Sequence, residues 1–345
     1  MLDHNASVLL IYTGGTIGMV EDVNGALKPF DFNALKEFVP ELKRFKFKID
    51  TIQFEKPVDS SDMDPQKWSK LVWIIQDNYD KYDGFVILHG TDTMAYSASA
   101  LSFMLENVDK PVILTGSQLP IGKIRTDGRD NLLTALEIAV DKAPDGKPFV
   151  TEVCIFFQDL LMRGNRTTKI NAANFKAFNS LNFPALAEAG TQIRYRHDLM
   201  HRPLRHSTPK FHYALDSKVA IVKIFPGMSV EVLKAVSAIP HLKAIVLETY
   251  GAGDAPGDQW FLDIVDEWIK KGIVVLNVTQ CASGSVNMDL YQAGKSLQEL
   301  GVLSGYDITT EAAVAKLMFL FGLGLTRQEV KISLKMSIVG EITVD

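Results

Sequence analysis

The chain has 345 residues and a formal net charge of −5, and 47% of its residues are hydrophobic. Such a length allows a large hydrophobic core and favours two domains over one. The negative charge provides no basic surface field, so we expect neither nucleic acid nor a membrane surface as a partner. Only two cysteines are present, Cys154 and Cys281, too few for a disulfide framework. This usage of cysteine favours a reducing, cytoplasmic location.

Three apolar runs in the first part of the chain end in the same way. Each is rich in β-branched residues and leads into glycine and a hydroxyl residue; the segments are VLLIYTGGTIG at 8–18, FVILHGTDT at 85–93 and PVILTGSQ at 111–118. We expect each run to be a buried strand. Ligands bind at the carboxyl ends of strands in open α/β sheets. The three endings therefore predict a small-molecule site lined with hydroxyl groups, which favours an enzyme.

Strand-like runs alternate with helical patterns over the first half of the chain, which is typical of a mostly parallel sheet covered by helices. A strand is expected at 49–54, and the Asp-Pro pair at 64–65 has the N-cap and first-turn residues of a helix. Further helices are predicted after Asp92 and near 131–140, and a further strand at 153–157.

Residues 194–214 are polar and have no sustained periodicity. We interpret them as a linker between a domain at 1–193 and a second, smaller α/β domain at 215–345. In the second domain we expect strands at 219–225, 244–248 and 273–278, a helix near 258–271, a helix capped by Thr310, and a capping box at 326–329 (TRQE).

Four histidines lie in the expected linker, at His197, His201, His206 and His212. No cysteine or carboxylate lies near them at the spacing of a metal site. We therefore expect no metal.

The strand endings allow more than one interpretation. The glycines of TGGTIG could form a purely structural turn. They could also form a phosphate-binding turn, but they lack the G-x-G spacing of a dinucleotide site, and no acidic residue ends a second strand at the required distance. Thr16 could instead be a nucleophile, provided that a base or a polarising group lies beside it. Thr91 and Asp92 precede a helical pattern, so either could simply cap that helix.

Two further segments are equally open. Residues 59–62 (DSSD) could supply spare capping groups, or their hydroxyl and N–H groups could bind a carboxylate. Residues 163–169 (RGNRTTK) form a surface turn on spacing alone, and Lys169 gains a function only if the fold brings it to Asp92. A carboxylate beside a hydroxyl, as at Thr91 and Asp92, offers a site for a substrate ammonium group.

Together these segments resemble the bacterial-type L-asparaginases, specifically the cytoplasmic type I branch. TGGTIG at 13–18 and HGTDTM at 89–94 carry most of the resemblance, which spans essentially the whole chain; the supporting segments are DSSDM at 59–63, TGSQ at 115–118, RGNRTTK at 163–169 and TQCASG at 279–284. The resemblance implies a two-domain α/β fold, with a larger N-terminal domain built on a mostly parallel sheet and a smaller C-terminal domain. It also implies a homodimer or a dimer of dimers.

The resemblance further implies hydrolysis of L-asparagine to L-aspartate and ammonia, without metal or organic cofactor. Thr16 would attack the side-chain amide and form an acyl-enzyme ester that water then hydrolyses. Asp92 would orient Lys169, and Lys169 would tune the hydroxyl of Thr91 by accepting or returning a proton.

A set of substrate-binding residues follows from the same resemblance: Asp59, Ser60, Ser61, Gly90, Thr91 and Asp92. The two serines and the Asp59 backbone would hold the α-carboxylate of the substrate, and Asp92 would pair with its α-ammonium group. Backbone N–H groups near Gly90 and Thr91 would stabilise the oxyanion. Such ion pairing favours a free amino acid over an asparagine inside a peptide.

The chain departs from the family pattern at two places. Ala26 stands where the family usually has a loop tyrosine that assists the nucleophile, which leaves the activation of Thr16 open. Some type I enzymes also have an allosteric asparagine site, and Thr168 and Cys281 match residues of it. Glu248, however, stands where the family example has arginine. Because a carboxylate there repels the carboxylate of the effector, we expect no such activation.

The sequence leaves other functions open. L-Glutamine could be a substrate as well, since specificity for one methylene is worth only about 1–3 kcal/mol. The amidase subunit of a tRNA-dependent amidotransferase is disfavoured, because no extra domain precedes the first strand. An amino-acid-binding sensor that has lost catalysis is the alternative from another class of protein, and Ala26 is the residue that keeps it open.

Overall fold

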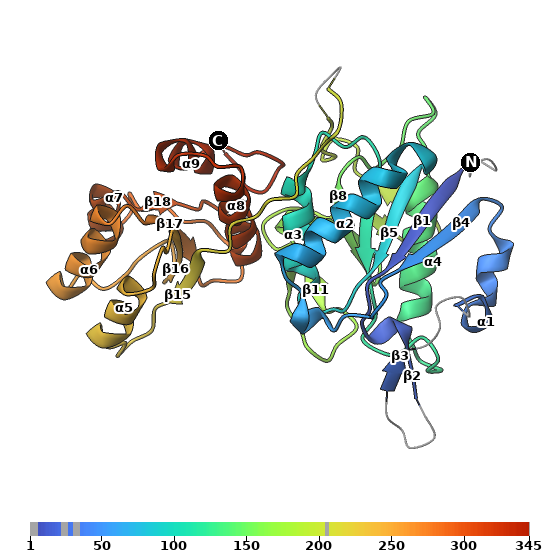
Figure 1. Ribbon diagram of the computed structural model, residues 1–345, viewed down its shortest axis with the longest axis horizontal. Coiled ribbons are helices and arrows are strands. Elements are labelled where there is room, and N and C mark those ends of the chain that lie inside the picture. The colour runs from blue at the N-terminus through green and yellow to red at the C-terminus, as the bar shows by residue number, and fades with distance from the viewer. Residues whose placement is uncertain (1–5, 22–26, 30–34, 204–206, 345) are drawn as a thin grey trace. The chain divides into compact units, whose positions relative to one another are not determined.

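The structure is a computed structural model that describes residues 6–21, 27–29, 35–203 and 207–344 (Figure 1). The chain divides into two compact units, Met1–Tyr213 and Ala214–Asp345. Each unit is an α/β structure with its own sheet and its own hydrophobic core. The two-domain α/β fold expected from the sequence is confirmed. None of the described helices is long and apolar enough to cross a membrane.

The first unit is built on an eight-stranded sheet in the order β13-β12-β9-β8-β7-β5-β1-β4. Its five parallel strands are β4 (Lys48–Gln53), β1 (Ser7–Tyr12), β5 (Gly84–Leu88), β7 (Val112–Thr115) and β8 (Val153–Phe157). The remaining strands are antiparallel: β9 (Leu160–Arg163), β12 (Ala187–Ala189) and β13 (Ile193–Tyr195). The expected mostly parallel sheet is therefore present, with an antiparallel extension at one edge.

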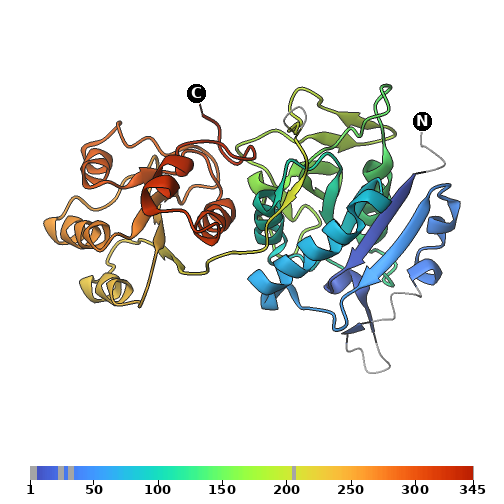
Figure 2. The same cartoon turned by 45° about the horizontal axis from the view of Figure 1, so that its top comes forward.

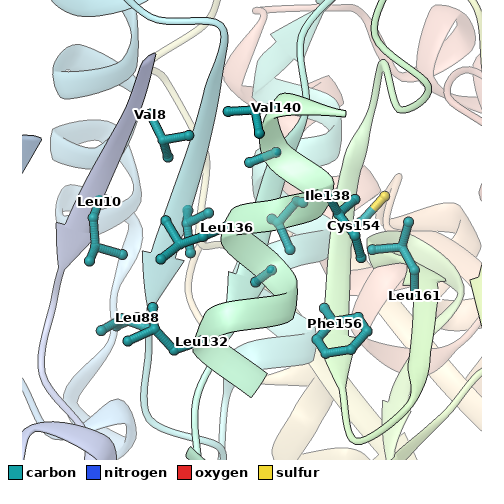
Figure 3. Close-up of a cluster of buried hydrophobic side chains, with 14 of the residues drawn as sticks. Val8, Leu10, Leu88, Leu132, Leu136, Ile138, Val140, Cys154, Phe156 and Leu161 are labelled. Atoms are coloured by element: carbon teal, nitrogen blue, oxygen red, sulfur yellow. The ribbon is translucent and has the colours of Figure 1, made fainter. Parts of the chain in front are cut away.

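Three main helices cover this sheet: α2 (Pro65–Asn78), α3 (Met94–Met104) and α4 (Gly128–Val140). They lie on both faces of the sheet, as Figures 1 and 2 show. The expected cap of α2 is confirmed, since the Asp64 carboxylate accepts a hydrogen bond from the Lys67 N–H at 2.9 Å. Figure 3 shows α4 packed on the strands, with Leu132 and Leu136 among the side chains that form this core.

Short elements complete the unit. They are η1 (Thr16–Gly18), β2 (Met19–Glu21), β3 (Leu27–Pro29), α1 (Leu35–Phe38), η3 (Pro40–Arg44), η4 (Ser60–Asp62), η5 (Tyr79–Lys81), β6 (Leu105–Glu106), η6 (Gly164–Arg166), β10 (Thr168–Lys169), β11 (Phe178–Asn179) and β14 (Lys210–Phe211).

The segment interpreted as a linker, 194–214, differs from that expectation. β13 begins at Ile193 and belongs to the large sheet, and β14 pairs with β6. The first unit ends only at Tyr213, whose ring stacks on Trp73 at 4.3 Å between centroids. Strands of two or three residues are held by backbone hydrogen bonds, and they are too short to produce a visible period in the sequence.

The second unit has a parallel sheet of β15 (Val219–Lys223), β16 (Ala244–Thr249), β17 (Val274–Thr279) and β18 (Leu303–Ser304). Its helices are α5 (Val230–Ser237), α6 (Gln259–Lys270), α7 (Gln292–Leu300), α8 (Thr310–Gly322) and α9 (Arg327–Leu334). The capping box of Thr326 and Glu329 is confirmed. Thr309, not Thr310, caps α8, because its hydroxyl is the one that reaches the Ala312 N–H.

A buried polar chain lies behind the end of β5. Trp68 Nε1 donates to Ser97 Oγ at 2.8 Å, Ser97 Oγ lies 2.8 Å from His89 Nε2, and His89 Nδ1 lies 2.7 Å from the Gly90 carbonyl oxygen. Burial lowers the pKa of His89 to about 4, so its ring is neutral at pH 7. A carbonyl only accepts, so Nδ1 carries the proton and Nε2 accepts from Ser97. The chain thereby fixes the orientation of the Gly90 carbonyl.

We expect acid to destabilise the protein through His89. The folded state binds this proton only near pH 4, while the unfolded chain binds it near the ordinary value of 6.5. The contribution of the neutral ring to the free energy of unfolding is therefore fully present above pH 6.5. It is lost as the pH falls towards 4, by at most about 1.4 kcal/mol per pH unit and roughly 3 kcal/mol in all. Urea unfolding of the wild type and of His89→Gln between pH 7 and pH 4.5 measures this difference in slope.

Equal pH slopes in the two proteins would contradict a buried neutral His89. An NMR titration of the wild type provides the independent check, because the ring protons of His89 should keep their neutral chemical shifts down to about pH 5.

Candidate active site

The site begins at two glycines that follow β1. Gly14 and Gly15 have φ angles of +137° and +90°, which side chains rarely adopt. A β-carbon on Gly14 would lie 2.2 Å from the Val58 carbonyl oxygen, and one on Gly15 would lie 2.5 Å from Cα and N of Gly90. Three segments far apart in the sequence therefore meet here, and only glycine allows them to approach so closely.

Thr16 opens the η1 turn directly after these glycines, and its side chain is half-buried. No described residue hydrogen-bonds to its hydroxyl. The turn is held from below by the buried Tyr12, whose hydroxyl donates to the Gly18 carbonyl at 3.2 Å. Burial raises the pKa of Tyr12 to about 12, so the phenol remains a donor at neutral pH. Thr16 thus has a fixed backbone and a hydroxyl that is available to a ligand.

Thr91 and Asp92 follow β5 and lie beside the Gly15–Gly90 contact. Helix α3 begins at Met94 with Thr93 as its N-cap, so neither Thr91 nor Asp92 caps it. The Thr93 hydroxyl donates instead to the Ser60 carbonyl at 2.6 Å, which ties the second segment to the DSSD loop. The capping interpretation of Thr91 and Asp92 is therefore wrong, and both side chains remain available for other contacts.

Lys169 reaches both of these side chains from β10. Its ammonium nitrogen lies 2.9 Å from Thr91 Oγ1 and 2.7 Å from Asp92 Oδ1. Thr91 is buried and Lys169 nearly so, while the Asp92 side chain is 68% exposed. The fold therefore brings Lys169 to Asp92, which is the condition for a functional role of this lysine. The lysine lies 77 positions from Asp92 and 78 positions from Thr91 in the sequence. An amine held by a carboxylate against a buried hydroxyl is suited to moving a proton.

The DSSD loop, residues 59–62, lies against Gly90. A β-carbon on Gly90 would lie 2.6 Å from Ser60 Oγ, so this serine contacts the motif directly. Asp59 accepts hydrogen bonds at 2.9 Å from both the N–H and the hydroxyl of Ser61, and these bonds lower the pKa of Asp59. The carboxylate therefore shapes the loop that presents the two serines.

Gln118 also contacts Thr91, and the sequence did not predict this contact. It follows β7, and its Oε1 lies 3.2 Å from Thr91 Oγ1. The signal was present, because Gln118 ends the third of the three strand endings that point to a ligand site. An uncharged amide gave no reason to select it.

The contacts described above do not include the other residues singled out in the sequence. Ala26 lies outside the described residues, and so does His206. Thr168 pairs with Asn179 in the β10–β11 hairpin, while Glu248 and Cys281 belong to the second unit. In the described part of the chain, no three His, Cys, Asp or Glu side chains gather as metal ligands would.

Comparisons with known proteins identify the family of this chain. Residues 7–201 match the family described as asparaginase, N-terminal, and residues 218–333 match the glutaminase/asparaginase C-terminal domain. L-asparaginase 1 of Escherichia coli K12 is 43% identical over 344 residues, which cover 98% of either chain. The 60 kDa lysophospholipase of Mus musculus is 37% identical over 361 residues, covering 98% of this chain and 62% of that protein.

A crystal structure of L-asparaginase I from Vibrio cholerae has the same fold. It is 40% identical in sequence and superimposes with a TM-score of 0.89 over 99% of this chain and 100% of that one. Both family matches and both full-length relatives point the same way. The chain belongs to the asparaginase family, in its type I branch.

Proposed function

We propose that this protein hydrolyses L-asparagine to L-aspartate and ammonia through an acyl-enzyme on Thr16. The observation that carries the proposal is the contact of Lys169 with both Thr91 and Asp92. It is supported by the close approach of Gly15 to Gly90 and by the hydroxyl of Thr16, which has no protein partner among the described residues. The name of the Escherichia coli relative, L-asparaginase 1, agrees with this substrate.

The reaction runs in two halves. Thr16 Oγ adds to the carboxamide carbon, its proton passes to the leaving nitrogen, and the C–N bond breaks to release ammonia. Water then adds to the remaining ester, the C–O bond to Thr16 breaks, and the hydroxyl regains a proton as L-aspartate leaves. Both halves pass through an oxyanion.

Lys169, Thr91 and Asp92 move the protons in this scheme. The Asp92 carboxylate orients the amine, and the amine sets the basicity of the Thr91 hydroxyl. The N–H groups of Gly90 and Thr91 make no hydrogen bond within the described residues. They are available as donors to the oxyanion, and His89 fixes the peptide between them by holding the Gly90 carbonyl.

Substrate binding uses the groups around Gly90. Ser60, Ser61 and the Asp59 backbone hold the α-carboxylate, and the exposed Asp92 carboxylate pairs with the α-ammonium group. An asparagine within a peptide has neither charge, so a free amino acid binds better. We also propose a cytoplasmic enzyme, in keeping with the free thiols of Cys154 and Cys281, that assembles as a homodimer or a dimer of dimers.

L-Glutamine is the second candidate substrate, because residues 218–333 match a domain named for glutaminase as well as asparaginase. A binding protein without catalysis is the remaining alternative. The first experiment separates the enzyme from the binding protein, and the second separates the two substrates.

We expect Thr16→Ala to lower the rate of ammonia release from L-asparagine by about 10⁴-fold or more, because the acyl-enzyme cannot form without the hydroxyl. Thr16→Ser keeps the hydroxyl and serves as the matched control, so it should retain measurable turnover and trap acyl-enzyme on acid quench. Unchanged turnover in Thr16→Ala would exclude this nucleophile, and an inactive wild type would leave the binding protein as the function.

We expect kcat/KM to be higher for L-asparagine than for L-glutamine by about 10–200-fold, the range that one methylene provides. Ammonia release at matched concentrations well below KM measures this ratio. Equal values would assign the chain to the glutaminase-asparaginases of broad specificity.

We expect a hyperbolic dependence of rate on L-asparagine concentration. Glu248 accepts a hydrogen bond from the Thr310 hydroxyl at 2.6 Å and lies 3.5 Å from the Lys223 ammonium group. Its negative charge disfavours the carboxylate of an asparagine effector at this position. Steady-state rates over a wide range of substrate concentration test this, and a sigmoidal curve in the wild type would overturn the expectation.

A further inference from the structure

Gln118 occupies a fixed position between two parts of the site. Its backbone N–H donates to both carboxylate oxygens of Asp127, at 3.1 and 2.9 Å, and the next N–H, of Leu119, donates to the same carboxylate at 3.1 Å. The side chain is half-buried. These bonds hold the loop after β7 in place, so the Gln118 amide projects from a rigid support.

The contacts of the amide settle which way it points. Its Nε2 lies 3.1 Å from the carbonyl oxygen of Asn174, in the loop between β10 and β11. A carbonyl cannot donate, so the NH₂ group faces Asn174 and Oε1 faces Thr91. An amide oxygen cannot donate either. The hydrogen bond between Gln118 Oε1 and Thr91 Oγ1 must therefore use the proton of the Thr91 hydroxyl.

This bond decides where the only proton of the Thr91 hydroxyl lies. With that proton directed to Gln118, the Thr91 oxygen accepts from Lys169 and keeps its second lone pair for a ligand. The distance of 3.2 Å is longer than an ordinary O–H···O bond, so the proton is oriented without being held strongly. Thr91 therefore presents an acceptor to the site in the resting enzyme.

We propose that Gln118 is a positioning residue for amide hydrolysis, which directs the Thr91 proton away from Lys169 and keeps a Thr91 lone pair ready for the reacting groups. The proposal rests on the function proposed above. The alternative is a purely structural role. In that case the hydrogen bond from Gln118 Nε2 to Asn174 would only hold the β10–β11 hairpin, with its Lys169, against the loop after β7.

Two substitutions separate these roles. Gln118→Met is similar in size but lacks both the acceptor for Thr91 and the donor for Asn174. Gln118→Glu lacks only the donor, because a carboxylate still accepts from the Thr91 hydroxyl. Both variants are assayed for kcat and KM with L-asparagine across pH 5–10.

We expect Gln118→Met to lower kcat by tenfold or more, with KM changed less than threefold, because the Thr91 proton is no longer directed. Gln118→Glu should recover most of that loss. Because its carboxylate places a negative charge beside the contact of Thr91 with Lys169, the kcat–pH profile of this variant should differ from that of the wild type.

The control for loosening the hairpin is Asn171→Ala. Asn171 Oδ1 accepts from the N–H groups of Ala173 and Asn174, so this variant relaxes the same loop without touching Thr91. It should leave the pH profile unchanged. Equal losses in the Met and Glu variants, with the wild-type pH profile in both, would overturn the proposal and leave only the tie to the hairpin.

Retention of full kcat in Gln118→Met would also overturn it. These outcomes are distinct from failure of the proposed function, in which the wild type itself releases no ammonia from L-asparagine.

Discussion

The arrangement of the site depends on one close backbone approach. Gly15 and Gly90 pack so tightly that a β-carbon on residue 15 would lie 2.5 Å from two backbone atoms of Gly90. The contact joins the loops that follow β1 and β5, so Thr16 and Thr91, which follow the two glycines, lie beyond the carboxyl ends of two neighbouring parallel strands. Gly90 also contacts Ser60, so the position of Gly90 helps to place the loop that we assign to the substrate carboxylate.

Features that depend on nearby residues could be predicted from the sequence. The apolar runs became strands, and the caps at Asp64 and Thr326 formed as expected, because a cap needs only partners within three or four residues. The interpretation of 194–214 as a linker was wrong because the partners of this segment are not nearby in the sequence. β13 and β14 are held by strands distant in sequence, and two or three residues carry too little pattern to reveal such pairing.

Contacts over long sequence distances were harder to predict. Family resemblance suggested that Lys169 and Thr91 meet, and the fold shows the amine 2.9 Å from the hydroxyl. The strand ending placed Gln118 near the site, but the sequence did not indicate its contact with this hydroxyl, since the orientation of its side chain depends on Asp127 and Asn174 together. Charge and motif identify groups that react, whereas neutral groups that orient them emerge only from the assembled geometry.

The start of α3 shows how function departs from local preference. Threonine and aspartate are good N-caps, worth about 1 kcal/mol, yet Thr91 and Asp92 do not cap this helix, and its N-cap Thr93 makes no capping bond. The Thr93 hydroxyl binds the Ser60 carbonyl, and the other two side chains meet Lys169. Local stability is given up where three polar side chains converge on one cluster. Such a departure from local rules is characteristic of a functional site, and here it marks the residues assigned to the chemistry.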